Sequence, residues 1–358
     1  GRNTQVSRSN YFYPESGAFY EHSLRLFENL GQELDFNIML SQRGILSLCH
    51  SAHEMEVYRR WANAIRMNGI DSRLLSREDL RKRVLQLNLD SRYPVYGGFI
   101  QERGGISRHD AVAWAYARQA SAAGVDIVQQ CEVTAMECTD NRVLALHTSR
   151  GRISADRFAL CVAGHSGALA AMAGLRLPIT TIALQAMVTE PLRPIFHTVM
   201  MSARVHVYVS QSDRGEIVIG GGADPFNSYA QRGSLDTHLH NLAALVELLP
   251  MFSRLRMLRH WAGTCDMAYD VSPIVGKTPL ENLYVSTGWG TGGYKAIPAG
   301  GDPSGDRQIE ALARPRARRH DGAAPGQPSR ARLHAVTGRR DGAGRAQPVE
   351  HGAGRGTR

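Results

Sequence analysis

The strongest constraint on the fold is an apolar strand that runs through a glycine into a helix. Arg157–Ala163 reads Arg-Phe-Ala-Leu-Cys-Val-Ala, a continuous run typical of a strand buried on both faces. Gly164 follows, and the small residues of Ser166–Met172 indicate a short helix. A glycine between strand and helix lets the backbone approach a ligand closely. The passage therefore predicts a ligand-binding α/β unit.

A second passage of this kind lies near residue 290. Ser272–Gly276 and Leu283–Thr287 predict two strands that meet the glycine-rich loop Gly288–Gly293. The loop should open a helix, so its free backbone N–H groups can face an anion or the edge of an electron-rich ring. A glycine-rich loop alone is often only a mobile turn. Its position after a buried strand favours a binding site, with Lys295 beside the ligand.

The remaining elements alternate between helical and strand-like patterns. Apolar spacing and cap residues predict helices near 20–30 (stopped by Gly31), 55–68, 77–85 (capped by Ser76 with Asp79), 111–123 and 235–249. Strands are predicted at 126–128, 131–138 and 143–148 as a meander, at 182–189, and at 206–210 and 216–221 as a hairpin. One mostly parallel and one antiparallel strand system follow, which makes the fold class mixed α/β.

Composition limits the class of protein. A chain of 358 residues with 43% hydrophobic content can fill a large core. It contains no membrane-length apolar run and opens with no charged-then-apolar leader, so we expect a cytoplasmic protein without a membrane segment. Five singly spaced cysteines predict neither a disulfide framework nor a zinc site, and we expect no metal.

The net charge of +9 is concentrated at the C-terminal end. Residues 301–358 carry twelve Arg and six Asp or Glu, which leaves only +3 on the first 300 residues. That segment has no Lys and no aromatic residue, unlike folded nucleic-acid-binding surfaces, so we expect no nucleic-acid partner. After Ile297 too few apolar residues remain to form a core, which predicts disorder over 301–358. Because GC-rich DNA encodes such composition in a shifted frame, we hypothesise a frameshift near Ala299.

Several segments together resemble the FAD-dependent amino-acid oxidases, most specifically the β subunits of heterotetrameric sarcosine oxidases. The resemblance runs nearly continuously from about Gly1 to Ile297. The segments that carry it are Arg2–Tyr11, Tyr20–Ser23, Ser41–Gly44, Ile106–Tyr116, Ala163–Ser166, His206–Gln211, Gln231–Ser234, Ser272–Pro279 and Gly288–Lys295.

The resemblance implies a glutathione-reductase-like FAD-binding domain interleaved with an antiparallel-sheet substrate domain. FAD-binding parts would cover about 1–35, 105–175 and 265–300, and substrate-domain parts about 36–104 and 176–264. The family begins with a strand, a Gly-X-Gly-X-X-Gly turn and a helix, and this chain starts downstream of that unit. We therefore expect an N-terminally truncated FAD domain with an exposed sheet edge, weak FAD binding and poor solubility.

For the substrate, the resemblance implies that Arg8 and Lys295 clamp a carboxylate over the flavin. Taken alone, Arg8 in its polar run would be an ordinary solvated charge. His206 and Tyr208, two apart on one predicted strand, would share a face and line the same pocket. Without the resemblance, ordinary hairpin packing is the simpler interpretation of that pair.

For FAD, the resemblance places Val133 near the adenine and Ala163 and Gly164 near the diphosphate or ribose. It places Gly290, Thr291, Gly292 and Gly293 at the pyrimidine edge of the isoalloxazine. Cys265 lies where monomeric relatives attach their flavin covalently. The heterotetrameric relatives bind FAD non-covalently, and we expect the same here, with Cys265 an ordinary buried cysteine.

His109 is the candidate for a second flavin. By sequence alone it is a structural histidine at a helix start, with Asp110 as the cap. The resemblance implies a covalently attached FMN on this histidine, at the interface with an α subunit. Together with γ and δ subunits, these chains would form a heterotetramer.

The activity implied is oxidative demethylation of sarcosine to glycine. Electrons would pass through FAD and FMN to oxygen, giving hydrogen peroxide and either formaldehyde or 5,10-methylenetetrahydrofolate. A related substrate such as dimethylglycine or proline is one alternative. An inactive truncated fragment that contributes only an assembly surface is another. A nucleic-acid-binding role through the arginine-rich tail ranks last.

Overall fold

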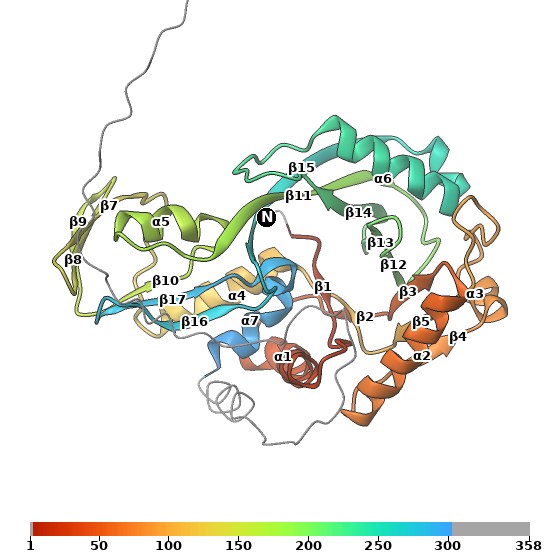
Figure 1. The fold of residues 1–358 in the computed structure, drawn as a ribbon, viewed down its shortest axis with the longest axis horizontal. Helices are drawn as coiled ribbons and strands as arrows, with labels where there is room; N and C mark the ends of the chain where they lie inside the picture. The colour runs from red at the N-terminus through yellow and green to blue at the C-terminus, as the bar shows by residue number, and fades with distance from the viewer. Residues whose placement is uncertain (1–2, 303–358) are drawn as a thin grey trace, which may run out of the picture.

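The computed structural model describes residues 3–302. Their largest element is an eight-stranded sheet, antiparallel except where β12 runs parallel to β3. Its strands in spatial order are β15 (Met257–Ala268), β11 (Ile179–Pro191), β14 (Glu216–Ala223), β13 (Val207–Gln211), β12 (Val199–Ser202), β3 (Ile45–Cys49), β5 (Gly97–Gln101) and β4 (Arg73–Leu75). In Figure 1 this sheet runs across the upper and right parts of the molecule.

Helices cover this sheet and close its core. Helices α3 (Arg77–Arg83) and α6 (Leu235–Leu248) contribute Leu80 and Leu245 to an apolar cluster that includes Met187 of β11. Helix α2 (Ala52–Met67) packs Ile65 against Phe99 of β5. Burial of this apolar surface supplies most of the driving force for folding of this half.

The second half has a small sheet in which β10 (Phe158–Leu160) runs parallel to β17 (Leu283–Thr287), followed by antiparallel β16 (Ile274–Lys277). Beyond it, β7 (Val133–Cys138), β8 (Val143–Thr148) and β9 (Gly151–Ser154) form a meander. The strand–glycine–helix passage is confirmed, with α5 at Ser166–Met172, although β10 is shorter than predicted and exposes Ala159. The prediction of a mostly parallel strand system is wrong for the described residues, because this small sheet contains one parallel pair, β10–β17, and one antiparallel pair, β17–β16.

A third layer combines short strands and three helices. Helices α1 (Pro14–Glu33), α4 (His109–Ala122) and α7 (Gly293–Gly301) share an apolar cluster in which Phe27, Val112 and Tyr294 are buried. Beside them, β1 (Val6–Ser7), β6 (Gly105–Ile106) and β2 (Ser41–Gln42) form a small antiparallel sheet. Figure 1 shows α1 and α7 adjacent to each other below the large sheet.

The structure corrects several local predictions. The third meander strand is β9, reached by a two-residue turn at Ser149 and Arg150, whereas residues 126–128 form an exposed loop. Helix α1 continues through Gly31, and the chain leaves it at Asp35, which has a left-handed φ of 45°. Asp110 is not a cap: Arg108 is the N-cap residue, and Asp110 lies inside the first turn of α4, paired with Arg108.

Other predictions hold or remain open. Ser76 and Asp79 form the expected capping box of α3. The interleaved domain boundaries stay a prediction, and the one at residue 264 would divide the continuous strand β15. The tail predicted to be disordered lies outside the described residues apart from Gly301, which ends α7, and Asp302. The frameshift near Ala299 likewise stays a hypothesis.

Asn282 joins the meander to the small sheet. Its buried amide accepts a hydrogen bond from the Val143 N–H at 2.9 Å and donates to the Val143 and Asp156 carbonyls at 2.8 and 3.1 Å. Asn282→Ala would leave these backbone groups without partners, so we expect a loss of about 2–3 kcal/mol of unfolding free energy in urea titrations. Asn141→Ala, which removes an exposed amide bonded to Glu281, should cost less than about 0.5 kcal/mol. Equal losses would contradict the bridging role of Asn282.

Candidate active site

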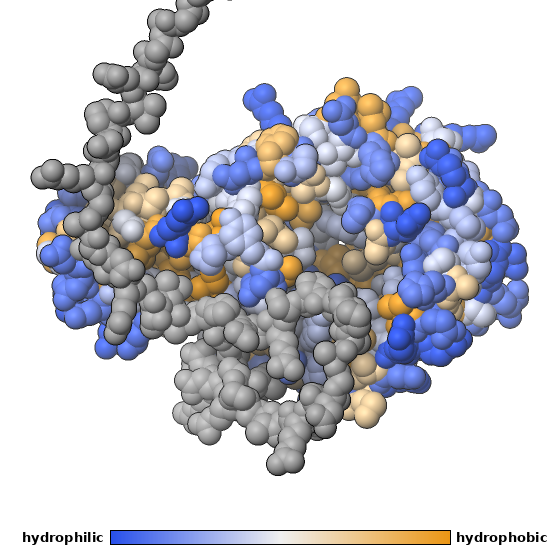
Figure 2. All heavy atoms as spheres, in the orientation of Figure 1, coloured by the Kyte–Doolittle hydropathy of each residue, from blue (hydrophilic) through white to orange (hydrophobic). Residues whose placement is uncertain are grey.

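A cavity of about 1010 Å³ lies where the large sheet, the small sheet of β10, β17 and β16, and the layer of α1, α4 and α7 meet. Its walls come from the segment around β1, from the start of α7, and from four strands of the large sheet, β15, β11, β14 and β13. Two 3-10 turns complete it, η1 (Ala163–His165) through Ala163 and η3 (Gly290–Gly292) through Gly290. Figure 2 shows a hollow near the middle of the molecule with apolar residues on its walls.

Arg8 and Lys295 both line this cavity, although they come from opposite ends of the described chain. The Arg8 guanidinium donates to Asn10 Oδ1 at 2.6 Å and lies over the Tyr11 ring, 4.5 Å from its centroid. Lys295 is in the first turn of α7, where its Nζ donates to the Thr291 carbonyl at 2.8 Å. The fold thus brings into one cavity two cations that the family resemblance implied as a pair.

Burial and neighbouring charges change the pKa values of Lys295 and Tyr11. Desolvation lowers the pKa of Lys295, which is 8% exposed, and the Arg8 charge lowers it further, against the opposing effect of Tyr11. Burial would raise the pKa of Tyr11, but the neighbouring charges of Lys295 and Arg8 outweigh it and leave that pKa lowered. A buried ammonium is stabilised by a nearby anion. The arrangement is therefore suited to binding a small carboxylate.

His206 and Tyr208 both line the cavity, but not for the predicted reason. His206 is exposed in the turn before β13, with a left-handed φ of 51°, so the two residues do not share one strand. The turn passes so close to β14 that a Cβ on Gly221 would lie 1.8 Å from the His206 carbonyl oxygen. Tyr208 is on β13; its hydroxyl bonds Thr4 Oγ1 at 2.7 Å, and burial raises its pKa to about 12.

Some of the predicted cofactor-binding glycines line the cavity, and others lie behind the residues that line it. Gly290, which has a left-handed φ of 52°, lines the cavity together with Thr291 and Gly293. Gly292 lies behind them, because a Cβ there would fall 2.2 Å from the Tyr20 hydroxyl. Gly164 similarly supports Ala163: its own Cβ would lie 2.6 Å from the Thr264 Cβ on β15.

Two predicted cofactor residues lie outside the cavity. Val133 begins β7 in the meander, and His109 begins α4. The half-buried His109 ring accepts a hydrogen bond from Gln5 Nε2 at its Nδ1, 3.0 Å away, when the ring proton is on Nε2. Burial is the main reason why the pKa of His109 is lowered, so the ring is neutral at pH 7. Any ligand on His109 would occupy a second site.

The structure adds residues that sequence reasoning missed. Asp266 is buried beside the cavity and accepts hydrogen bonds from Thr287 Oγ1 at 2.8 Å and from the Gly288 N–H at 2.6 Å. It thereby fixes β15 against the glycine-rich loop. Trp61 and Trp289 also line the cavity. No local pattern identifies Asp266, because only the approach of β15 to the end of β17 and to the glycine-rich loop gives it these partners.

The walls fit a flat aromatic cofactor. Glycines and small residues leave a broad surface, and backbone N–H groups at the start of α7 supply donors beside it. Cys265 lies in the wall, and burial raises the pKa of its thiol to about 12, which keeps it protonated. Within residues 3–302, no group of three or more His, Cys, Asp or Glu side chains is arranged to hold a metal ion. None of the helices described there has the length and apolarity to span a membrane.

Comparison with known proteins identifies the family of the chain. The family model for FAD dependent oxidoreductases matches residues 1–303. The chain is 49% identical to the sarcosine oxidase subunit beta of Rhodobacter capsulatus and 50% identical to that of Rhizobium meliloti, over 84% of this chain and 73% of each relative.

Solved structures share the fold at low sequence identity. L-proline dehydrogenase from P. horikoshii superposes with a TM-score of 0.79 at 20% identity, covering 86% of this chain and 83% of that one. Glycine oxidase from Geobacillus kaustophilus gives 0.76 at 18% identity, with 89% and 88% covered. The predicted glutathione-reductase-like architecture is therefore confirmed, and the family match and the sarcosine oxidase relatives show that the chain belongs to the FAD-dependent oxidoreductase family.

Proposed function

We propose that the chain oxidises the amine of sarcosine, as the β subunit of a sarcosine oxidase. The observation that carries this proposal is the convergence of Arg8 and Lys295 on one cavity beside a glycine-rich loop. The β-subunit relatives support the choice of sarcosine. Related secondary and tertiary amino acids are the nearest competing substrates.

The substrate carboxylate would bind between the Arg8 guanidinium and the Lys295 ammonium. Charge-assisted hydrogen bonds of this kind fix orientation as well as affinity. Fixing the carboxylate places the N-methyl group at a defined depth in the cavity, and such positioning accounts for much of enzymatic rate enhancement. The protonated Tyr208 hydroxyl, held by Thr4, can donate a hydrogen bond to bound substrate, and His206 would line the mouth of the same pocket.

Gly290, Thr291 and Gly293, supported by Gly292, would lie at the pyrimidine edge of the flavin ring of FAD. Ala163, supported by Gly164, would lie near the diphosphate or ribose, and Val133 toward the adenine. When bound, FAD supplies the hydride acceptor for the substrate carbon, and an FMN on His109 supplies the route of electrons to oxygen. The protonated Cys265 thiol is a poor nucleophile, which favours non-covalent FAD.

The remaining features of the proposal come from the resemblance to the heterotetrameric sarcosine oxidases. The designation of the relatives as subunit beta supports assembly with other chains, for which we propose α, γ and δ subunits in the cytoplasm. The products would be glycine, hydrogen peroxide and either formaldehyde or 5,10-methylenetetrahydrofolate. A purified chain with the yellow absorbance of FAD that oxidises sarcosine faster than dimethylglycine or proline would support the proposal. A colourless chain would favour an inactive fragment.

Removal of either cation should weaken carboxylate binding. For Arg8→Ala and for Lys295→Met we expect affinity for methoxyacetate, a sarcosine-shaped carboxylate with an ether in place of the amine, to fall about 100-fold, since a desolvated charge contact contributes about 2–5 kcal/mol. Isothermal titration calorimetry measures this affinity. Lys277→Met removes an exposed lysine outside the cavity and should leave the affinity unchanged. Unaltered binding by both cation variants would rule out the clamp.

Carboxylate binding should weaken with rising pH. Because burial lowers the pKa of Lys295 below the ordinary 10.5, the ammonium is lost at lower pH than in a free lysine. The dissociation constant for methoxyacetate should therefore begin to rise below pH 10.5. In Lys295→Met the binding is weaker, and this rise should be absent. An identical pH profile in both proteins would assign the titration to another group, such as Tyr11.

A covalent flavin on His109 can be tested directly. The chain, co-expressed with an α-type partner, should give a band that is fluorescent in acid on a denaturing gel, and His109→Ala should give a dark band. His53→Ala is the matched control, because His53 is an exposed histidine in the first turn of α2. Fluorescence that survives His109→Ala, or a dark parent band, would contradict covalent FMN at this position.

A further inference from the structure

One short segment of α1 contacts both chain segments that carry the cations. The segment Tyr20–Ser23 does not line the cavity, and the proposed chemistry gives it no role. Successive helix residues project about 100° apart. Tyr20 and Ser23 therefore share one face, whereas Glu21 points elsewhere. Together the two faces contact both segments.

The Glu21 face holds the segment of Arg8. Ser9, which is completely buried, donates its hydroxyl proton to Glu21 at 2.7 Å and accepts from Gln101 Nε2 at 2.6 Å. Its backbone N–H donates to Gln101 Oε1 at 3.0 Å, and its carbonyl accepts from the Tyr11 N–H at 2.7 Å. Every polar group of Ser9 is thus engaged, which fixes the backbone next to Arg8.

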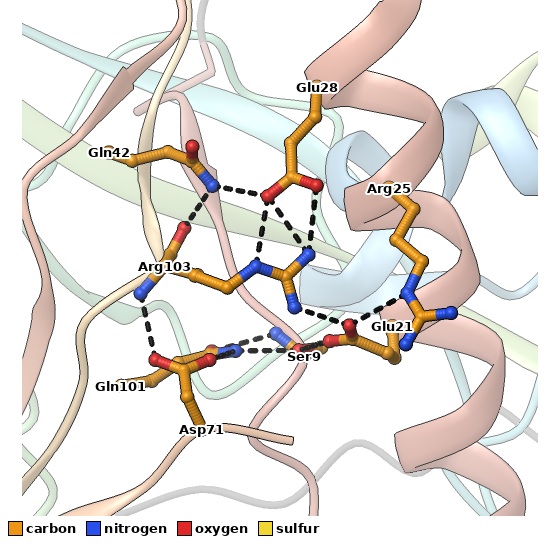
Figure 3. Close-up of polar contacts among 8 residues, drawn as sticks. All are labelled: Ser9, Glu21, Arg25, Glu28, Gln42, Asp71, Gln101 and Arg103. Carbon is orange, nitrogen blue, oxygen red and sulfur yellow. Dashed lines mark hydrogen bonds and ion pairs between the residues drawn. The ribbon is translucent and has the colours of Figure 1, made fainter. Parts of the chain in front are cut away.

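Glu21 is itself anchored by an ionic cluster (Figure 3). Its carboxylate pairs with Arg103 and with Arg25, the latter at 3.1 Å. Arg103 also makes a bidentate contact with Glu28 at 2.9 Å, and its backbone N–H donates to Asp71 at 2.9 Å. These partners compensate the charge of Glu21, whose side chain is only 7% exposed, and limit its movement.

The opposite face holds the segment of Lys295. Ser23 is fully buried and donates its hydroxyl proton to the Lys295 carbonyl at 2.6 Å. Tyr20 presses on Gly292, three residues before Lys295, and stacks on Tyr11 with ring centroids 4.2 Å apart. Tyr11 in turn lies beneath the Arg8 guanidinium. The α1 segment therefore contacts both arms of the clamp through separate side chains.

We propose that Tyr20–Ser23 is a positioning element that sets the spacing between Arg8 and Lys295, a role that rests on the proposed carboxylate clamp. A helix is rigid over one turn because its backbone is fully hydrogen-bonded. Two segments fixed to the same turn keep a constant separation. A carboxylate needs both cations at the correct distance, whereas a neutral ligand of equal shape does not.

The competing interpretation is that Ser9 and Ser23 only satisfy buried polar groups. In that case Ser9→Ala and Ser23→Ala would reduce stability without any preference between charged and neutral ligands. If the segment sets the spacing, each variant should weaken binding of the anion selectively.

The test compares methoxyacetate with neutral methoxyacetamide on the full chain. Binding is followed by the fluorescence of Trp61 and Trp289, which line the cavity. For Ser9→Ala and Ser23→Ala we expect the dissociation constant of methoxyacetate to rise about five- to tenfold, in line with loss of one hydrogen bond. That of methoxyacetamide should stay within about twofold. Ser76→Ala removes a serine–carboxylate hydrogen bond at the α3 cap, remote from the cavity, and should change neither constant.

Proportional changes for both ligands, or no change for either, would overturn the positioning role while leaving the clamp intact. Failure of the parent chain to bind methoxyacetate more tightly than methoxyacetamide would overturn the clamp itself, and this role with it. Because the two arms are tested by separate variants, one variant that does not fold leaves the other decisive.

Glu21→Gln retains an acceptor for Ser9 and should bind methoxyacetate more tightly than Glu21→Ala.

Discussion

The hydrogen bonds among Ser9, Gln101 and Glu21 join the large sheet to the helical layer below it. Gln101 ends β5, Glu21 lies in α1, and Ser9 connects them at a point where no solvent can replace a lost partner. An unpaired polar group here would cost about 1–3 kcal/mol. The segment that carries Arg8 is therefore fixed by groups that must stay paired for the fold itself to be stable, and the position of one cavity wall follows from this.

The cavity contains two cations in a setting that disfavours charge. Burial lowers the pKa of Lys295 and the Arg8 charge lowers it further, while the neighbouring Tyr11 only partly compensates. An incoming carboxylate would relieve this penalty, so the burial of these cations would favour the binding of an anion. Gly290 and Gly293 serve another need, because side chains there would fill the surface on which a flat cofactor could lie.

Much of the local structure could be predicted from the sequence. The α5 and β8 boundaries, the β17 strand and the capping box of α3 follow from apolar runs and cap residues. Strand β15 could not be predicted: Arg259, His260 and Asp266 interrupt any alternation, and pairing along the full length of β11 stabilises it as a strand. The same holds for His206, whose turn depends on close contact with Gly221.

The sequence by itself determined which residue types could do chemistry, and it determined many of the strands, glycine turns and helices, because these depend on neighbours a few residues away. It also determined the family, through motifs spread along 300 residues. Only the tertiary structure decided which of these residues meet. It places Arg8 and Lys295 in one cavity, Gly164 and Gly292 behind its wall, and His109 and Val133 outside it. Contacts between distant segments depend on how whole layers pack, and no local periodicity encodes that packing.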